Sequence, residues 1–186
     1  WVRATDTAGN VSLATTSTVT VAPTVPSVGT PSVAYNGELA VLSWTPTAGS
    51  LPITDYEVTG LVSPTESIIK STTYSVRVTW TGSRTISVRA RDTAGNYSTA
   101  STVAISPTAA AAPSTFTRAF VGDSLTLNWT AVAGELPTAE YEVRYGASYE
   151  NGTYLARVKT TTYTLAADWG PASRTFWVAG ISTNGQ

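Results

Sequence analysis

The sequence contains no cysteine, no histidine and no methionine. Without cysteine there can be neither disulfide bonds nor a thiolate nucleophile, and without histidine the commonest general base and the commonest zinc ligand are missing. Charged residues make up only 12% of the chain, where about 25% is usual. The net charge is −1 and the pI about 5.4, with no basic stripe. We therefore expect no nucleic-acid partner, because clustered cations hold such partners.

Long apolar runs are also missing. None approaches the ~20 residues that a membrane-spanning helix requires, and no secretory leader is recognisable, so no membrane insertion is expected. The lack of cysteine says nothing firm about the compartment. Trp1 stands in what reads as the middle of a strand, which predicts that the sequence is a fragment of a longer chain.

The residues that are abundant favour β structure. Hydrophobic residues, alanine included, make up 42% of the chain, and much of the remainder is Thr, Ser and Gly; Thr and Val suit the pleated surface of a sheet. Apolar and polar side chains alternate over residues 75–80, 86–91 and 125–129, and glycine-containing turns follow every ~8–12 residues. No stretch carries a helical stripe. The sequence predicts an all-β protein.

The chain also repeats itself. The phrase VRATDTAGNVS at 2–12 returns as VRARDTAGNYS at 88–98. LSWTPTAGSLPITDYEV at 42–58 returns 85 residues later as LNWTAVAGELPTAEYEV at 127–143. Further along, the extra residues of the later copy fall in 146–152 and in the loop after Trp169, as expected for insertions that a repeated fold tolerates.

Proline-rich segments separate the copies. VAPTVPSVGTP at 21–31 and ISPTAAAAPST at 105–115 predict short, stiff connectors, because proline fixes φ and favours extended backbone. The predicted organisation is therefore residues 1–22 as the last two strands of one domain, residues 23–107 as a complete domain, and residues 108–186 as a domain that lacks its last strand.

These repeats resemble fibronectin type III modules, which are immunoglobulin-like β-sandwiches. The resemblance covers the whole chain and is carried by L-x-W on a second strand (Leu42 and Trp44, Leu127 and Trp129), Y-x-V on a third strand (Tyr56 and Val58, Tyr141 and Val143), and the phrase from Val88 to Ser98 on the sixth. It implies tandem sandwiches with a structural core that includes Trp44, Trp129, Tyr56, Tyr141, Trp80 and Trp169. The family usually has a tyrosine at the start of the sixth strand, where this chain has Arg84 and Arg174. We expect the tryptophans before these arginines to anchor that corner instead.

The amino-acid sequence of the repeats is most similar to modules of siphophage tail-tip host-specificity (tip attachment) proteins. That resemblance implies non-catalytic spacer and presentation modules in a larger virion assembly. The partners would be other tail proteins and symmetry mates, as a homotrimer, with contact to a host cell-surface receptor or glycan and a location in the phage tail or outside the cell. The alternative is a linker in a secreted bacterial carbohydrate-active enzyme or a surface adhesin.

The repeated phrase is also a candidate ligand set. Asp6 with Asn10, and Asp92 with Asn96, offer oxygens of the kind that Ca²⁺ prefers. The other interpretation is a hairpin turn, in which aspartate accepts backbone N–H groups and glycine supplies a positive φ. The third copy, ISTNGQ at 181–186, keeps only the glycine. A turn survives that replacement, so the sequence favours a turn and predicts no metal site.

Aromatic residues could form a glycan-binding surface. Tyr145, Tyr149 and Tyr154 flank the predicted hairpin at 146–152, which makes them the candidates for a surface or glycan contact. Of the neighbours Phe176 and Trp177, one must face outward. Ordinary packing on strand edges is the alternative for all of them.

Paired carboxylates, the usual requirement for glycoside hydrolysis, are not apparent. Glu57 and Glu142 fall on the polar phase of a strand, where solvation is expected. With neither histidine nor cysteine available, the sequence predicts no catalytic residues and no cofactor.

Overall fold

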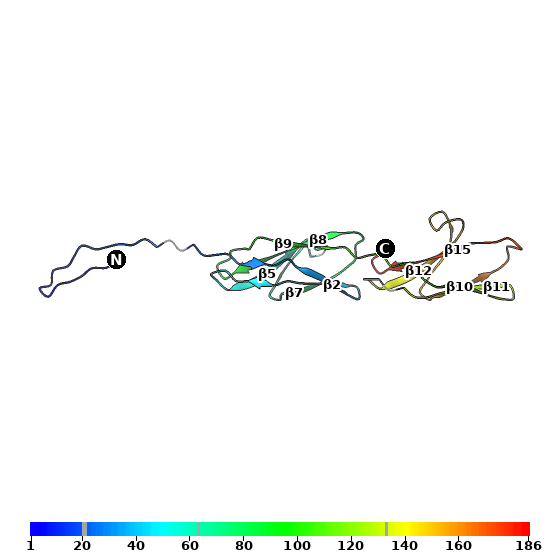
Figure 1. Ribbon diagram of the computed structural model, residues 1–186, viewed down its shortest axis with the longest axis horizontal. Helices are drawn as coiled ribbons and strands as arrows, with labels where there is room; N and C mark the ends of the chain where they lie inside the picture. Colours follow the sequence, from blue (N-terminus) through cyan, green and yellow to red (C-terminus); the bar gives the residue numbers. More distant parts are fainter. Residues whose placement is uncertain (20–21, 63, 133) are drawn as a thin grey trace.

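The computed structural model describes residues 1–19, 22–62, 64–132 and 134–186. The described residues form strands and loops without helices, so the chain is all-β. Two β-sandwiches follow one another in line, and a hairpin of residues 1–19 extends from the end of the first (Figure 1). In the described part of the chain, no helix is long and apolar enough to cross a membrane.

The first sandwich packs a three-stranded sheet, β2-β3-β7, against a four-stranded sheet, β6-β5-β8-β9, with the short pair β1-β4 beside them, and all pairs are antiparallel. Its strands are β1 (Ser27–Val28), β2 (Ser32–Asn36), β3 (Leu39–Ser43), β4 (Pro46–Thr47), β5 (Ile53–Thr59), β6 (Glu66–Ile69), β7 (Thr73–Arg77), β8 (Arg84–Asp92) and β9 (Ser101–Ile105).

The second sandwich repeats this plan with a smaller second sheet. The sheet β10-β11-β14 packs against β13-β12-β15, again with antiparallel pairs. Its strands are β10 (Phe116–Val121), β11 (Ser124–Trp129), β12 (Thr138–Tyr145), β13 (Thr153–Val158), β14 (Thr162–Ala166) and β15 (Phe176–Ser182). Among the described residues nothing occupies the place that β9 has in the first sandwich, so β15 is an edge strand.

Alternation places the core. Every second residue of β8 from Ile86 onward is buried, and the inward side chains of the two sheets form one hydrophobic cluster in each sandwich. Trp44 contacts Tyr56 edge to face with ring centroids 5.5 Å apart, and Trp129 contacts Tyr141 at the same distance. All four rings are buried. The two sandwiches are therefore built around the same aromatic pair.

Strand β7 is shorter than the alternation through residue 80 predicts. It ends at Arg77, where Val78 N donates to Glu38 O and the chain leaves the sheet. Trp80 lies in the following loop and packs against the core cluster from there. The Trp80 side chain thus points inward like that of a strand residue, although the backbone around it belongs to no strand.

Candidate functional site

The repeated phrase forms the same turn wherever it occurs. In the first sandwich, Asp92 Oδ1 accepts from the backbone N–H groups of Ala94 and Asn96, both at 2.9 Å, and Asp92 Oδ2 accepts from Asn96 Nδ2 at 3.0 Å. Gly95 follows with φ of 87°, a conformation that favours glycine. In the first copy, Asp6 accepts the corresponding three hydrogen bonds from Ala8 N, Asn10 N and Asn10 Nδ2, each at 2.9 Å.

These contacts leave no ligand set. Asn96 turns its N–H₂ group towards Asp92, and the oxygens of Asp92 already accept hydrogen bonds. The hydrogen bond from the Asn96 side chain holds the pKa of Asp92 below its ordinary value, with the backbone N–H groups acting in the same direction. The described residues include no group of three acidic side chains that could hold a metal ion. The geometry is that of a turn.

The third copy keeps the backbone of this turn without its aspartate. Ser182 N donates to Gln186 O at 2.7 Å and Gly185 N to Ser182 O at 2.8 Å, the pattern that Asp92 N to Asn96 O and Gly95 N to Asp92 O make. Before the glycine of this turn, where the other copies have alanine, the third copy has Asn184. The side chain of Asn184 contacts the first sandwich, as described below. This copy therefore lies at the joint between the two sandwiches.

Two acidic residues of the sheet faces are not solvated, contrary to the expectation from their polar phase. Glu57 and Glu142 are buried, with 5% and 4% exposed, because arginines cover them. Arg89 pairs with Glu57, and Arg91 donates two hydrogen bonds to the carboxylate of Asp55, at 2.9 and 2.6 Å. Buried carboxylates require such partners, and ion-paired groups are not free for acid–base chemistry.

In the second sandwich, Glu142 joins two arginines and a tyrosine. Its Oε1 accepts from Arg144 Nε at 2.5 Å and from the hydroxyl of Tyr149 at 3.3 Å, and its Oε2 accepts from Arg157 Nε at 2.9 Å. Burial alone would raise the pKa of Glu142, but the hydrogen bonds from Arg144 and Arg157 outweigh it and hold the pKa below its usual value. The cluster ties the loop at 146–152 to the sheet.

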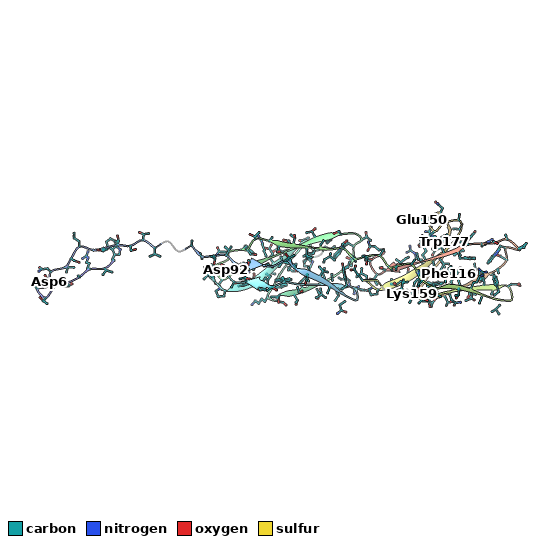
Figure 2. The ribbon with its side chains drawn as sticks, in the orientation of Figure 1. Asp6, Asp92, Phe116, Glu150, Lys159 and Trp177 are labelled. Atoms are coloured by element: carbon teal, nitrogen blue, oxygen red, sulfur yellow. The ribbon has the colours of Figure 1, made fainter. Side chains whose placement is uncertain are left out.

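The three candidate tyrosines occupy different environments. Tyr145 is half-buried and packs against Phe176, with Arg174 above its ring at 4.8 Å. Tyr149 is half-buried through its contact with Glu142. Tyr154 is 53% exposed. Phe176 packs in the core while Trp177 Nε1 donates to Gly146 O at 2.9 Å, and the hairpin carrying Glu150 projects from the sandwich (Figure 2).

Tryptophan and arginine form the corner where the resemblance would place a tyrosine. Arg84 stacks on Trp80, 5.2 Å from the ring centroid, and Arg174 stacks on Trp169 at 4.7 Å. Both tryptophans pack against their core clusters. The indole N–H of Trp80 has no hydrogen-bond partner among the described residues. Packing and a cation–π contact hold this corner in both sandwiches, and in the first sandwich Arg84 also donates to Gly60 O at 3.2 Å.

The joint between the sandwiches was not predicted from the sequence. Leu136, in the loop between β11 and β12, is fully buried and belongs to the core cluster of the first sandwich. Asn184 Nδ2 donates to Trp80 O at 2.9 Å. The side-chain amide of Gln186 lies 3.1 Å from Pro107 O and 3.2 Å from Gly82 N. The loop that carries Leu136 and the turn at 182–186 of the second sandwich thus pack against the adjacent end of the first sandwich.

The connector is bonded to the same loop. Thr108 donates from its backbone N and its Oγ1 to Glu135 Oε2, at 2.6 and 3.1 Å. The connector before the first sandwich repeats the arrangement: Thr24 N donates to Ser50 Oγ at 2.9 Å, and Ser50 N donates to Thr24 O at 3.0 Å. Both connectors are therefore fixed to the sandwich that follows them.

A signal for the joint was present in the sequence. The repeats keep S-L-P at 50–52 and E-L-P at 135–137, which places an apolar leucine in a polar loop. An unexplained leucine at a repeated position indicates a contact outside its own module. What the sequence could not show is which neighbour Leu136 contacts.

No protein-family model and no curated protein matches the sequence. Similar solved structures include the central fibronectin-III array of RIM-binding protein, which is 18% identical over 84% of this chain and 58% of that one, with a TM-score of 0.36. The FN1–FN3 domains of chicken CNTN1 are 14% identical over 85% and 62%, with a TM-score of 0.36. A two-domain fibronectin type III segment of chicken tenascin is 22% identical over 86% and 84%, with a TM-score of 0.35. The chain spans about six tenths of the length of the first two. It is an all-β protein of tandem β-sandwiches, similar in fold to fibronectin type III arrays.

Proposed function

We propose that this chain is a non-catalytic spacer that holds successive β-sandwiches in a fixed line and presents what lies beyond them. The observation that carries the proposal is the joint, where Leu136 of the second sandwich is buried in the core cluster of the first. A flexible tether would leave such a side chain in water. Here any bending at the joint would expose Leu136 and break the contact between Asn184 and Trp80.

The pairing of the buried carboxylates is in keeping with the same proposal. The buried carboxylates of Asp55, Glu57 and Glu142 are engaged with arginines. General acid–base catalysis requires a carboxyl group that can reach a substrate and exchange a proton with it. Ion pairs of this kind stabilise a sheet face instead.

The joint can be tested with one substitution and its positional counterpart. Leu136→Ser should let the sandwiches move independently, because a buried apolar contact is replaced by a polar group. Residual dipolar couplings should then report two alignment tensors in place of one, and small-angle scattering should show a broader distance distribution. Leu51→Ser is the control, since Leu51 holds the same place in the first sandwich and is not at this joint. One common tensor in Leu136→Ser would contradict the proposal.

The finer assignment that we propose is a bacteriophage tail-tip host attachment protein, acting within a virion as a homotrimer. This assignment is supported by the amino-acid sequence of the repeats and by the low content of charged residues. Antibodies raised against the chain should label the tail tip of intact virions and leave the capsid unlabelled. Labelling of a secreted bacterial enzyme or a surface adhesin would favour the alternative instead, and neighbouring coding sequence would separate the two.

A contact with a host glycan is the second candidate, and the exposure of Tyr154 favours it. Its ring lies on the strand next to Arg144 and is free to stack on a sugar face. Tyr154→Ala should abolish binding on a glycan array if this surface is used. Tyr163→Ala is unsuitable as a control because Tyr163 packs in the core, so Glu150→Ala on the projecting hairpin serves instead. Unchanged binding in Tyr154→Ala would exclude the contact.

A further inference from the structure

Three asparagines of the chain are followed directly by glycine, at 36–37, 151–152 and 184–185. In such a pair the backbone nitrogen of the glycine can attack the side-chain amide of the asparagine, since glycine has no Cβ to hinder the approach. The nitrogen loses its proton to solvent as it bonds to Cγ, and Nδ2 takes up a proton from solvent and leaves as ammonia. Water then opens the resulting succinimide ring to aspartate or isoaspartate. Each pair is therefore a candidate site of spontaneous deamidation.

Two of the pairs are open to this reaction. Asn36 lies at the exposed turn of the hairpin between β2 and β3, and Gly37 N has no backbone hydrogen-bond partner among the described residues. Asn151 is exposed on the hairpin at 146–152, where Gly152 N makes one long backbone bond of 3.3 Å. Little therefore restrains the reacting atoms of either pair.

The third pair is held at both of its reacting groups. The side-chain amide of Asn184 donates from Nδ2 to Trp80 O across the joint at 2.9 Å, and its Oδ1 accepts from Gln186 N at 3.3 Å. The attacking atom, Gly185 N, donates to Ser182 O at 2.8 Å. Ring formation joins Gly185 N to Asn184 Cγ and expels Nδ2, so it breaks the bonds to Ser182 O and Trp80 O. The closed joint therefore opposes the reaction.

Deamidation at 184 removes the donor that the joint uses. Either product has a carboxylate where Asn184 has an amide, and an ionised carboxylate only accepts hydrogen bonds. Two acceptors then face each other at Trp80 O. Isoaspartate also adds one carbon to the backbone of the turn, which displaces Ser182 from Gln186. The other copies of the turn have alanine at this place and no amide to lose.

We propose that Asn184 and Gly185 form a deamidation site that the joint controls. The pair reacts while the two sandwiches are apart, and the charged product keeps them from docking again. A reaction that proceeds through an opened state has a rate in proportion to the population of that state. Each event leaves one negative charge at 184, so the covalent structure records the opening of the joint. This control requires the docked joint on which the proposed function rests, and it adds a chemical limit to the lifetime of the joint.

Peptide mapping by mass spectrometry measures aspartate and isoaspartate at the three pairs during incubation of the whole chain at neutral pH. In the wild type, position 184 should react more than about tenfold more slowly than position 36. Leu136→Ser should raise the rate at 184 by more than about threefold and leave the rate at 151 unchanged, because the open joint frees Asn184. Leu51→Ser is the matched control and should change neither rate. Equal rates at 184 and 36 in the wild type, or no increase at 184 when Leu136→Ser separates the sandwiches, would overturn the proposal.

The effect of the product on the joint is measured with Asn184→Asp, which introduces the carboxylate without the added carbon. Residual dipolar couplings should report two alignment tensors for Asn184→Asp. They should report one for Asn151→Asp, which adds the same charge on the hairpin that carries Glu150 (Figure 2). One common tensor in Asn184→Asp would show that the product leaves the joint closed, against the proposal. Two tensors in the wild type would instead contradict the fixed line of the proposed function, so the two failures are distinguishable.

Discussion

The side chain of Asn184 donates a 2.9 Å hydrogen bond to the backbone oxygen of Trp80, and so joins two residues that are 104 positions apart. This bond connects the last turn of the second sandwich with the corner loop of the first. Asn184 stands where the other copies of the turn have alanine. Two of the residues that differ in this copy, Asn184 and Gln186, therefore lie against the first sandwich.

Asn184→Ala should weaken the joint and keep the backbone of the turn, because alanine stands at this place in the other copies. The substitution removes the bond to Trp80 O together with the side-chain contacts to Gln186. Since a single hydrogen bond contributes about 0.5–1.5 kcal/mol, the free energy of unfolding, measured by chemical denaturation, should fall by at least that amount. The control is Thr183→Ala, whose hydroxyl has no partner among the described residues. Equal stability of Asn184→Ala and wild type would show that the bond does not contribute.

Asp92→Asn should lower the thermal midpoint of the first sandwich, because the amide that replaces one carboxylate oxygen would face the N–H₂ group of Asn96. The pKa of Asp92 is lowered in the folded state by that same side chain. Its stabilisation is therefore complete above the ordinary aspartate pKa of about 3.9 and is lost as the pH falls through the lower folded value.

The difference between wild type and Asp92→Asn should accordingly shrink below about pH 4, as measured by thermal denaturation at several pH values. Asp6→Asn makes the same change in the hairpin of residues 1–19, which contributes to neither core cluster. It should leave the midpoints of both sandwiches unchanged. A pH-independent difference for Asp92→Asn would show that the charge has no role.

Glu142→Gln should destabilise the second sandwich by about 1–3 kcal/mol, because it leaves Arg144 and Arg157 without a charged acceptor. The pKa of Glu142 is lowered in the folded state, so its stabilisation is present above the ordinary glutamate pKa of about 4.3 and is lost as the pH falls further. Denaturation at neutral and acidic pH measures both effects. Glu150→Gln, on the exposed part of the loop, should be neutral, and a loss as large as that of Glu142→Gln would contradict the assignment.

Gly49→Ala should disrupt the connector before the first sandwich, because an added Cβ would lie 2.0 Å from Thr24 O. Gly134 holds the equivalent place in the second sandwich, where the nearest atom would be at an ordinary 3.4 Å. Gly134→Ala should thus stay within about 0.5 kcal/mol of wild type, while Gly49→Ala loses the amide protection of Ser50 in hydrogen exchange. Retained protection would mean that the connector can shift to make room.

Much of the fold could be predicted because its signals are local. Alternation over 86–91 identified an inward and an outward face, and the repeated tryptophans and tyrosines indicated a sandwich core. The turn at 92–96 could be inferred from aspartate, glycine and asparagine at fixed spacing, because all its contacts lie within five residues. The domain boundaries at 22/23 and 107/108 stay predictions.

The misjudged features depend on contacts between distant residues. Glu57 was expected in solvent because its strand phase is polar, but Arg89, 32 residues away, covers it. Leu136 belongs by sequence to one sandwich and by packing to the other. No period within a strand encodes such contacts, which arise only when sheets and modules are assembled. The role of Tyr145, Tyr149 and Tyr154 in binding stays a prediction.

Each of the five-residue turns lies at the end of its unit that is nearer the start of the chain, as Asp6 and Asp92 show (Figure 2). The backbone bonds of the turn are the same in the copy at the joint, where the side chains of Asn184 and Gln186 lie against the preceding sandwich. The backbone of the loop thus stays constant while its side chains differ from copy to copy. A module of this kind can change its contacts with a neighbour in an array and still keep the turn that ends its sheet.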